Sequence, residues 1–309
     1  MQLFDLHCDT LYRSLFENQG FYQNDFDISI SKAKIFSNWI QCFAIWIPDT
    51  FRGKEAIDLL ERSYSRLIDE LNKNQEFIIR CKDKEDLKKA QRLKKFGAIF
   101  TIEGSAALGG DISLLDRCKE MGVKVITLTW NGVCEAGDGA LVENPKGITP
   151  FGKELIKRMN ELDIIIDVSH ASDKLFYDAL SLSKKPIIAT HSNSRKVCNH
   201  KRNLTDDQLK CIKENNGIVG INLCKDFLNA KKEADLSDIE KHIYHLLSIL
   251  GEDKVAFGGD LDGADLPIGY GGILGMKNLY EYLLKRNYKE ELLNKIFWSN
   301  AYNFFENNI

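Results

Sequence analysis

Short apolar runs alternate with helical stretches along this chain, and this alternation restricts the possible folds more than any other feature. Most of the runs are apolar at nearly every position, which is typical of parallel strands buried on both faces. We predict strands at residues 4–9, 40–47, 97–104, 123–130, 163–170, 186–192, 217–223 and 255–263. We predict helices at residues 54–73, 83–95, 149–162, 172–183, 205–216 and 235–250, and from about residue 277 onward. Eight strands that alternate with helices predict an α/β fold, a (β/α)8 barrel of the TIM type.

A doubly wound open sheet is the rival arrangement for such a pattern. Its dinucleotide-binding form carries a G-x-G-x-x-G motif after an early strand, and no such motif is present. Three of the predicted helices also begin with recognisable caps. Thr149 precedes Pro150 at a first helical position, Ser172 precedes the next helix, and Thr205 and Gln208 have capping-box spacing.

Length and composition describe an ordinary globular protein. The chain has 309 residues without a linker or repeat, so we expect one domain over residues 1–309. A net charge of −3 indicates neither nucleic acid nor a membrane surface as a partner. No apolar run approaches the roughly 20 residues of a transmembrane helix, and the first residues lack the features of a signal peptide. We therefore expect a cytoplasmic protein whose eight scattered cysteines are free thiols.

The first predicted strand places two polar residues close together. Side chains two apart in a strand point to the same face, so His7 and Asp9 should project together while Cys8 turns away. The other predicted strands end in similar residues, namely Glu103, His170, His191, Asp260 and Asp262. Because the carboxyl ends of all strands meet at one face of a barrel, three histidines and several carboxylates should converge there. This donor set suits a divalent metal such as zinc.

Each of these residues has an ordinary interpretation when it is considered alone. A single histidine at a strand end is most often a core or loop residue, Asp9 could cap a helix, and Glu103 could pair with an arginine. We read the other three histidines in this way: His200 in a polar loop, and His242 and His245 on a helix. The ordinary interpretation would have to hold at every strand end at once, which favours a metal site.

These motifs resemble the membrane dipeptidase (renal dipeptidase) family, metallopeptidase family M19. The resemblance covers essentially the whole chain and is carried, in the family's order, by "DLHCDTL", "TIEG", "VITLTWN", "ITPFGKELIKRMNELDIIIDVSH", "THSNSRKVCNHKRNLTDD" and "FGGDLDGA". The "FGGDLDG" motif and the R-N-x-x-D-D run at residues 202–207 are its most specific parts.

The resemblance implies a binuclear zinc site at the C-terminal face of the barrel. Two Zn²⁺ ions would be held by His7 and Asp9 on one side and by His170 and His191 on the other, with Glu103 bridging them. Mn²⁺ or Co²⁺ could replace zinc. Two such ions can share a hydroxide and polarise a carbonyl, Asp260 would carry protons, and Arg202 would bind the substrate carboxylate. The implied activity is hydrolysis of unblocked dipeptides, with a D-residue tolerated at the C-terminal position.

One position departs from the family pattern. Mammalian members carry a histidine after "LTLT" that is thought to steady the tetrahedral intermediate, and this chain has Trp130 there. An indole offers one N–H donor and does not titrate. We expect the Trp130 ring to form part of the wall beside the metals, where it contacts the substrate.

Two alternative functions fit less well. Other amidohydrolase-type barrels that act on cyclic amides or esters often begin with H-x-H and carry a lysine on the fourth strand, whereas this chain has His7-x-Asp9 and no lysine in "VITLTW". An inactive barrel used for binding would have no need of Asp260 beside two metals. The sequence leaves a homodimer open.

Overall fold

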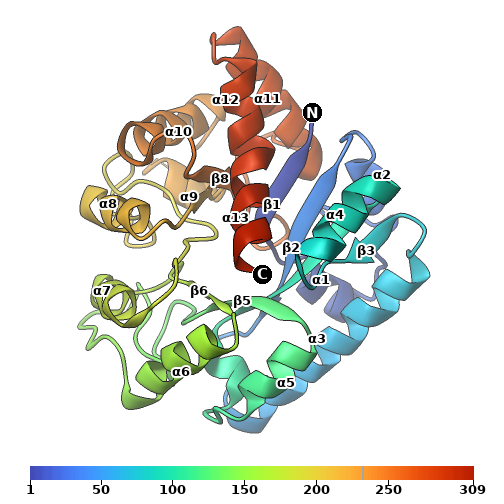
Figure 1. Cartoon of the computed structure of the whole chain (residues 1–309). Coiled ribbons are helices and arrows are strands. Elements are labelled where there is room, and N and C mark those ends of the chain that lie inside the picture. Colours follow the sequence, from blue (N-terminus) through green and yellow to red (C-terminus); the bar gives the residue numbers. More distant parts are fainter. Residues whose placement is uncertain (232) are drawn as a thin grey trace.

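A computed structural model describes residues 1–231 and 233–309. Its strands form one sheet in the order β6-β5-β4-β2-β1-β8-β7, in which every pair is parallel (Figure 1). The bounds are β1 Leu3–Cys8, β2 Trp39–Trp46, β3 Ile78–Arg80, β4 Phe96–Glu103, β5 Val123–Thr127, β6 Ile165–Asp167, β7 Val219–Ile221 and β8 Val255–Phe257. The short β3 pairs with β4 outside this path.

The segment predicted as the sixth barrel strand, residues 186–192, closes the ring without forming a regular strand. It makes only single parallel bridges, Asp167↔Ile188 to one side and Ala189↔Val219 to the other. Backbone hydrogen bonds support both contacts, from Val168 N to Ile188 O and from Gly220 N to Ala189 O, each 2.8 Å. The prediction of a TIM-type barrel is therefore confirmed.

Three glycines let this closing segment approach its neighbours. A Cβ on Gly220 or Gly258 would lie 1.9 Å or 1.8 Å from the carbonyl oxygen of Thr190, and one on Gly217 would lie 1.9 Å from that of Ile187. Real Cβ atoms cannot come so close to a backbone oxygen. The glycines in "GIVGINL" and "FGGDLDG" are thus explained by close packing at the point of closure.

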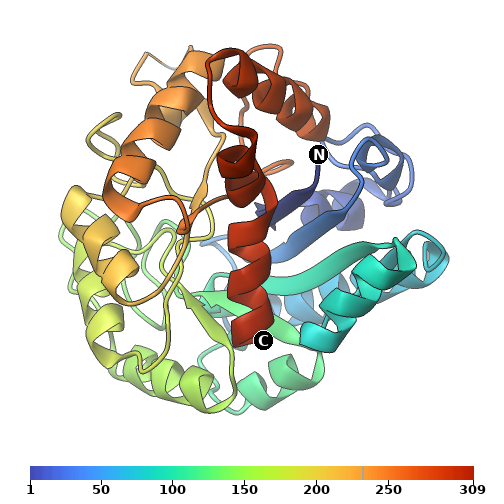
Figure 2. The ribbon, with the colours of Figure 1, turned by 45° about the horizontal axis from the view of Figure 1, so that its top comes forward.

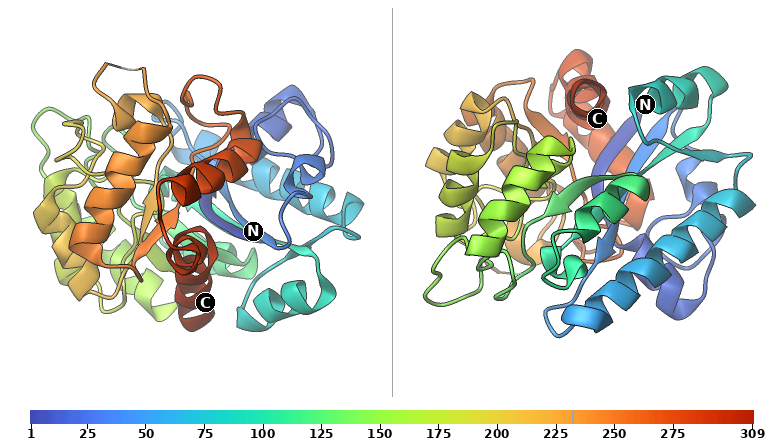
Figure 3. Two further views of the ribbon diagram at one scale, coloured as in Figure 1. Left: turned by 90° about the horizontal axis from the view of Figure 1, so that it is seen from above. Right: turned by 60° about the horizontal axis from the view of Figure 1, so that its bottom comes forward.

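Apart from the C-terminal helix, the helices surround the ring on its outside, as the turned views show (Figures 2 and 3). The larger ones are α1 Thr10–Glu17, α3 Gly53–Lys73, α4 Lys84–Leu93, α5 Leu114–Glu120, α6 Pro150–Glu161, α7 Asp173–Leu182, α8 Asp206–Glu214, α10 Leu236–Leu250, α11 Gly275–Lys285 and α13 Asn300–Asn308. Shorter turns are α2 Ile30–Ala33, η1 Ser105–Leu108, α9 Lys225–Leu228, η2 Gly272–Leu274, α12 Glu290–Asn294 and η3 Lys295–Ser299. Among the residues described, no helix has the length and apolarity needed to cross a membrane.

Most predicted elements are present, with shifted ends. Thr149, Ser172 and Thr205 each accept the capping hydrogen bond expected of them, and Gln208 completes the capping box. The helices α1 and α5 and the strand β3 were not predicted. The strands predicted at 163–170, 217–223 and 255–263 are three residues long, because their ends leave the ladder to form the site.

The C-terminal helix α13 closes the amino-terminal end of the barrel. A buried apolar cluster contains residues from or beside every barrel strand together with the aromatic side chains of η3 and α13. The ring of Phe4 in β1 lies 5.1 Å from that of Phe305 and 6.1 Å from that of Trp298. In Figure 2 α13 crosses the centre of the ring. The polar residues are therefore left to the opposite, carboxyl end.

Candidate metal centre

Six of the residues predicted for the site come together at the carboxyl end of the barrel. All but Asp260 are buried, and Asp260 is nearly so: His7, Asp9, Glu103, His170, His191 and Asp260. Glu103 is the last residue of β4, and His7 is the residue before the last one of β1. Asp9 occupies the N-cap position of α1, yet its side chain makes no capping hydrogen bond. Its carboxylate thus remains available to the site.

Glu103 lies between two histidine groups. Its Oε1 is 2.8 Å from His170 Nε2 and 3.3 Å from His191 Nε2, while its Oε2 is 3.6 Å from His7 Nε2. The two Nε2 atoms of His170 and His191 are only 2.9 Å apart. One carboxylate therefore faces both halves of the site, as a bridging ligand would.

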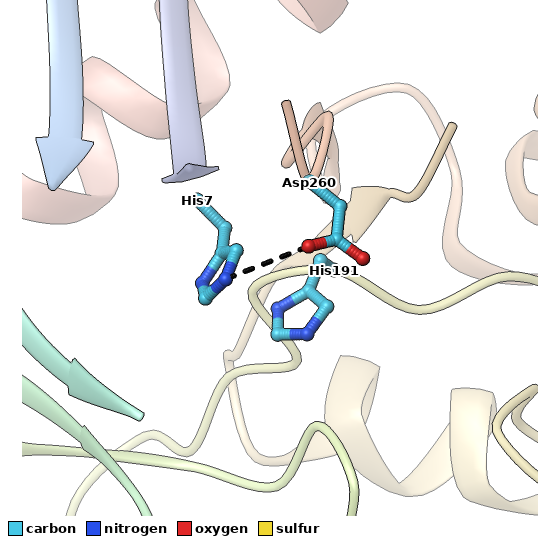
Figure 4. Close-up of side chains that lie close together, drawn as sticks. All are labelled: His7, His191 and Asp260. Carbon is cyan, nitrogen blue, oxygen red and sulfur yellow. Dashed lines mark ion pairs between the residues drawn. The ribbon is translucent and has the colours of Figure 1, made fainter. Parts of the chain in front are cut away.

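The second half of the site is built around His7. His7 Nε2 lies 3.5 Å from Asp9 Oδ2 and 3.7 Å from Asp260 Oδ1. Figure 4 shows His7 and Asp260 facing each other, with the ring of His191 beside them. The ring centroids of His7 and His191 are 3.9 Å apart. Cys8 packs instead in the buried core, as the alternation of side chains predicts.

These side chains have the chemistry of a divalent-metal site. Three overlapping groups could each hold an ion: His7–Asp9–Glu103, Glu103–His170–His191 and His7–His191–Asp260. Two of their buried atoms, His7 Nε2 and Asp9 Oδ1, have no hydrogen-bond partner among the described residues. A buried polar atom without a partner is costly, and imidazole nitrogen and carboxylate oxygen are ligands of divalent metals. The residues present fit bound metal.

The charges of the site favour a cation at its centre. Burial lowers the pKa of His7, but the carboxylates of Glu103, Asp9 and Asp260 outweigh burial and raise the pKa to about 10. Burial also raises the pKa of Glu103 well above its usual range. Both shifts have one physical cause, which is negative charge enclosed where water cannot stabilise it. A metal ion in this position would neutralise the enclosed negative charge.

His170 and His191 are held as neutral imidazoles. Burial lowers the pKa of each histidine well below its usual value, and the positive charges of Arg202 and His7 lower it further. His170 Nδ1 lies 2.9 Å from Asn131 Oδ1, an acceptor, so the proton of His170 is on Nδ1. The free lone pair of its Nε2 then points toward Glu103.

Thr190 fixes the proton of His191 in the same way. Thr190 Oγ1 lies 2.6 Å from Asp167 Oδ2 and 2.8 Å from His191 Nδ1. Because a carboxylate only accepts, the single hydroxyl proton goes to Asp167. The hydroxyl oxygen then accepts from Nδ1–H of His191, which leaves Nε2 unprotonated. Lone pairs of His170, His191 and Glu103 thus meet within 3.3 Å, an arrangement that needs a cation.

Asp260 is held by the strand beside it. Asn222, directly after β7, donates from Nδ2 to Asp260 Oδ2 over 2.9 Å. Asp260 has a positive φ of 57°, and His170 has one of 67°. Such conformations cost energy in residues with a side chain and cluster at functional sites. A Cβ on Gly263 would lie 1.9 Å from Asp9 Oδ2, so a side chain there would displace the carboxylate of Asp9.

Arg202 lies beside the site, in the loop between the sixth segment of the barrel and α8. It is 3% exposed, and its Nη2 donates to His191 O over 3.4 Å. Its Nε has no partner among the described residues, and its guanidinium lies 5.3 Å from the centroid of Phe227. Burial lowers the pKa of Arg202, partly offset by Asp260 and Glu103. A buried guanidinium with unused donors can bind an anion.

A cavity of about 560 Å³ opens above these residues. The metal-centre residues Asp9, Glu103, His170 and Asp260 form part of its lining, and Trp46, Trp130 and Phe227 form apolar parts of its wall. Its volume is in the range of small-molecule sites. The chemistry of the centre is therefore accessible only to a ligand that fits this space.

Comparison with known proteins decides the family. The family model described as membrane dipeptidase, peptidase family M19, matches residues 1–308. The chain belongs to this family. Membership makes it a hydrolase of the metallo-dipeptidase type, and the resemblance stated from the motifs is confirmed.

Relatives of this M19 protein agree with the assignment. An uncharacterised protein in the pqqA 5′ region of Klebsiella pneumoniae is 35% identical over 230 residues, which cover 71% of this chain and 85% of that protein. A metallopeptidase from Rhodobacter sphaeroides, liganded with a phosphinate mimic of the dipeptide L-Ala-D-Ala, is similar over 100% of this chain and 99% of its own, with a TM-score of 0.93 and 26% identity. The dipeptidase AC, an M19 metallopeptidase, also has a TM-score of 0.93, with 27% identity over 100% of this chain and 98% of its own.

Trp130 lies where the sequence of this M19 protein predicted. Its ring lines the cavity and is half-buried, 6.2 Å from the ring of His170 and 5.0 Å from that of Trp46. The ring therefore forms part of the cavity wall and does not pack behind the barrel.

Other candidate residues lie outside the metal centre. Asp262 accepts hydrogen bonds from Thr10 Oγ1 over 2.5 Å and from Asp27 N over 2.6 Å, so it holds the loop after α1. His242 lies between Ser194 N and Leu228 O, and His245 pairs with Asp206 over 2.7 Å. His200 Nδ1 accepts from Arg202 N over 3.2 Å. None of the three histidines belongs to a described metal group.

Four supporting residues were not predicted from the sequence: Asn131, Asp167, Thr190 and Asn222. Two of them carried a usable signal, because Asp167 interrupts the apolar run "DIIIDVSH" and Asn222 ends the run "GIVGIN". The same rule that selected polar residues at strand ends would have found these two. The roles of Asn131 and Thr190 depend on contacts that only the folded chain makes.

Proposed function

We propose that this protein is a binuclear zinc-dependent dipeptidase that hydrolyses the peptide bond of unblocked dipeptides, including those with a D-residue at the C-terminal position. The observation that carries the proposal is the position of Glu103, whose two carboxylate oxygens face His170 and His191 on one side and His7 on the other. The relative from Rhodobacter sphaeroides holds a mimic of L-Ala-D-Ala, which supports tolerance of a D-residue.

His7 and Asp9 would hold one ion, His170 and His191 the other, and Glu103 both. When bound, the two ions would supply an activated water at neutral pH and polarise the scissile carbonyl. Mn²⁺ or Co²⁺ could occupy the same donor set, since these metals also accept nitrogen and oxygen ligands.

The protein's own groups perform the remaining tasks. Arg202 would pair with the substrate carboxylate through its unused donors, a charge-assisted contact worth roughly 1.5–3 kcal/mol. Asp260 lies 3.7 Å from His7 Nε2 and would accept the proton of the attacking water and pass it to the leaving amine. Asn222 holds the other oxygen of Asp260 and so orients it.

The test is metal analysis combined with a substrate screen. We expect close to two divalent ions per chain after incubation with zinc, and hydrolysis of L,L and L,D dipeptides. The C-terminal amides of the same dipeptides should be cleaved about ten- to hundredfold less efficiently, because they offer Arg202 no carboxylate. A protein that binds no metal, or that cleaves the acids and the amides equally, would contradict the proposal.

A cytoplasmic location, a single domain over residues 1–309 and a homodimer remain predictions from the sequence. Cell fractionation tests the first, limited proteolysis the second, and a mass measurement in solution the third.

A further inference from the structure

Three aromatic side chains form a continuous wall on one side of the cavity. We call Tyr12, Trp46 and Trp130 the aromatic wall. The ring centroids of Tyr12 and Trp46 are 4.7 Å apart at 60°, and those of Trp46 and Trp130 are 5.0 Å apart at 64°. Both pairs are edge-to-face, the arrangement that aromatic rings favour. All three side chains are half-buried and line the cavity.

The aromatic wall is placed by packing. The indole N–H of Trp46 has no hydrogen-bond partner among the described residues, so the neighbouring rings hold this side chain. Trp46 ends β2 and pairs in register with Glu103 of β4. The wall therefore lies directly beside the bridging carboxylate of the proposed metal centre.

Arg202 lies across the barrel mouth from this wall. Around the closed ring the order is β1, β2, β4, β5, β6, the segment at 188–189, β7 and β8. Trp46 ends β2, Tyr12 lies in α1 just after β1, and Trp130 lies in the loop after β5. Arg202 lies in the loop that follows the segment at 188–189, which stands opposite β2, and its guanidinium is 5.3 Å from the ring of Phe227 on the cavity lining. A dipeptide whose carboxylate pairs with Arg202 would therefore extend its amino-terminal residue toward the wall.

The aromatic wall is an uncharged part of the cavity lining. The wall itself carries no ionisable carboxylate or cation. The rest of the lining is largely charged and includes Asp9, Arg13, Glu103, Asp226, Asp260, Asp262 and Asp265. Arg13 pairs with Asp262, and Lys225 pairs with Asp265. An apolar side chain gains free energy by leaving water for the aromatic surface, whereas a charged one would lose water there without gaining an ion pair.

We propose that the aromatic wall is a specificity subsite for a large apolar side chain on the amino-terminal residue of the dipeptide. This inference rests on the proposed dipeptidase function and names its substrate class.

The experiment compares Ala-Ala, Leu-Ala and Ala-Leu on the zinc-loaded protein. We expect kcat/KM for Leu-Ala to exceed that for Ala-Ala by about tenfold or more, and Ala-Leu to gain much less. Trp130→Ala should remove most of the preference for Leu-Ala, and Trp130→Phe should keep most of it. Tyr244→Ala is the matched control, since Tyr244 is 70% exposed on α10 and does not line the cavity.

The outcomes separate this inference from the function on which it rests. Cleavage of all three dipeptides with equal efficiency would overturn the subsite and leave the dipeptidase function intact. If no dipeptide is cleaved, the function fails, and the subsite is judged by calorimetric binding of phosphinate mimics of Leu-Ala and Ala-Ala. Equal affinity for the two mimics would then overturn the subsite. The subsite would be supported if the Leu-Ala mimic binds more tightly and Trp130→Ala abolishes this difference.

Discussion

The two halves of the barrel hold their parts of the candidate site by different means. In the first half, β1 has six residues and β2 and β4 have eight each; the β2–β4 ladder is continuous, and the β1–β2 ladder shifts register between Asp5 and Cys8. In the second half, β6, β7 and β8 have three residues each, and the segment between β6 and β7 makes only bridges. The backbone ladder positions Glu103, and His7 follows from the same sheet with its N–H donating to Asp5 Oδ1 over 3.0 Å. Hydrogen bonds to the hydroxyls of Thr190 and Ser169 position His191.

The second half replaces ladder bonds with buried polar side chains. Asp167 Oδ1 accepts from Ser169 N and Thr190 N, each over 2.9 Å, and its Oδ2 accepts from Thr127 and Thr190 hydroxyls. The side chain of Asn193 bonds twice to the backbone of Asn222. Its Nδ2 donates to Asn222 O over 2.9 Å, and its Oδ1 accepts from Asn222 N over 3.1 Å. Because the ladder contacts end at Asp167 and at Ala189, the chain leaves the sheet before it reaches His170 and His191. The buried side chains satisfy the backbone groups that the missing ladder leaves unpaired.

Glu103→Gln should have the largest effect, because Glu103 joins the two halves. A neutral amide in its place weakens both proposed ion sites, and we expect kcat/KM to fall by about a thousandfold or more, since metal-ion catalysis supplies several kcal/mol. Elemental analysis should show that both ions are lost together. Glu70→Gln is the control, a carboxylate on α3 that is 2% exposed and lies outside the site. Loss of one ion only would show that Glu103 does not bridge.

Thr190→Val tests whether side chains position the second half. The variant removes the acceptor of His191 Nδ1–H, and we expect metal affinity to fall about 10- to 100-fold, the range for loss of a supporting hydrogen bond to a ligand. Thr190→Ser keeps the hydroxyl and should retain most of the affinity. The measurement is a metal titration, with thermal unfolding of the metal-free variants to detect loss of fold. Equal loss in both variants would mean that the hydroxyl does not orient His191.

Gly258→Ala tests the close approach at the point of closure. Its Cβ would meet Thr190 O at 1.8 Å, and we expect the free energy of unfolding to fall by about 1–3 kcal/mol or more. Gly97→Ala in β4 is the counterpart in the first half, where the Cβ would meet side-chain atoms of Cys81 and Ile40 at 3.0 Å. Denaturant unfolding should show the smaller loss for Gly97→Ala. A similar loss of unfolding free energy in both variants would show that the backbone is not packed more closely at the point of closure than in β4.

Trp130→His should have the smallest effect and raise activity. The imidazole restores a group able to donate to the tetrahedral intermediate, and we expect hydrolysis of Ala-Ala to become severalfold faster without change in metal content. A preorganised donor can contribute roughly 2.7–4 kcal/mol, but the wall around Trp130 is built for a larger ring. Steady-state kinetics provide the measurement. No gain with small dipeptides would show that this position does not stabilise the intermediate.

The sequence by itself determined the barrel and the residues gathered at its mouth. Continuous apolar strands have to be buried on both faces, and parallel strands in a ring place their carboxyl ends together. His7, Asp9, Glu103, His170, His191 and Asp260 could thus be selected by their positions along the chain. Local signals also fixed the caps at Thr149, Ser172 and Thr205.

Only the tertiary structure decided how these residues are held. The Nδ1 protons of His170 and His191 depend on Asn131 and Thr190, and Asp262 proved to bind the loop at Asp27 instead of the centre. The strand predicted at 186–192 became a pair of bridges, because side-chain hydrogen bonds compete with the ladder there. Periodicity along a sequence reports which face a side chain takes. It does not report hydrogen bonds between residues distant in the chain, since their geometry exists only after the strands have closed into a ring.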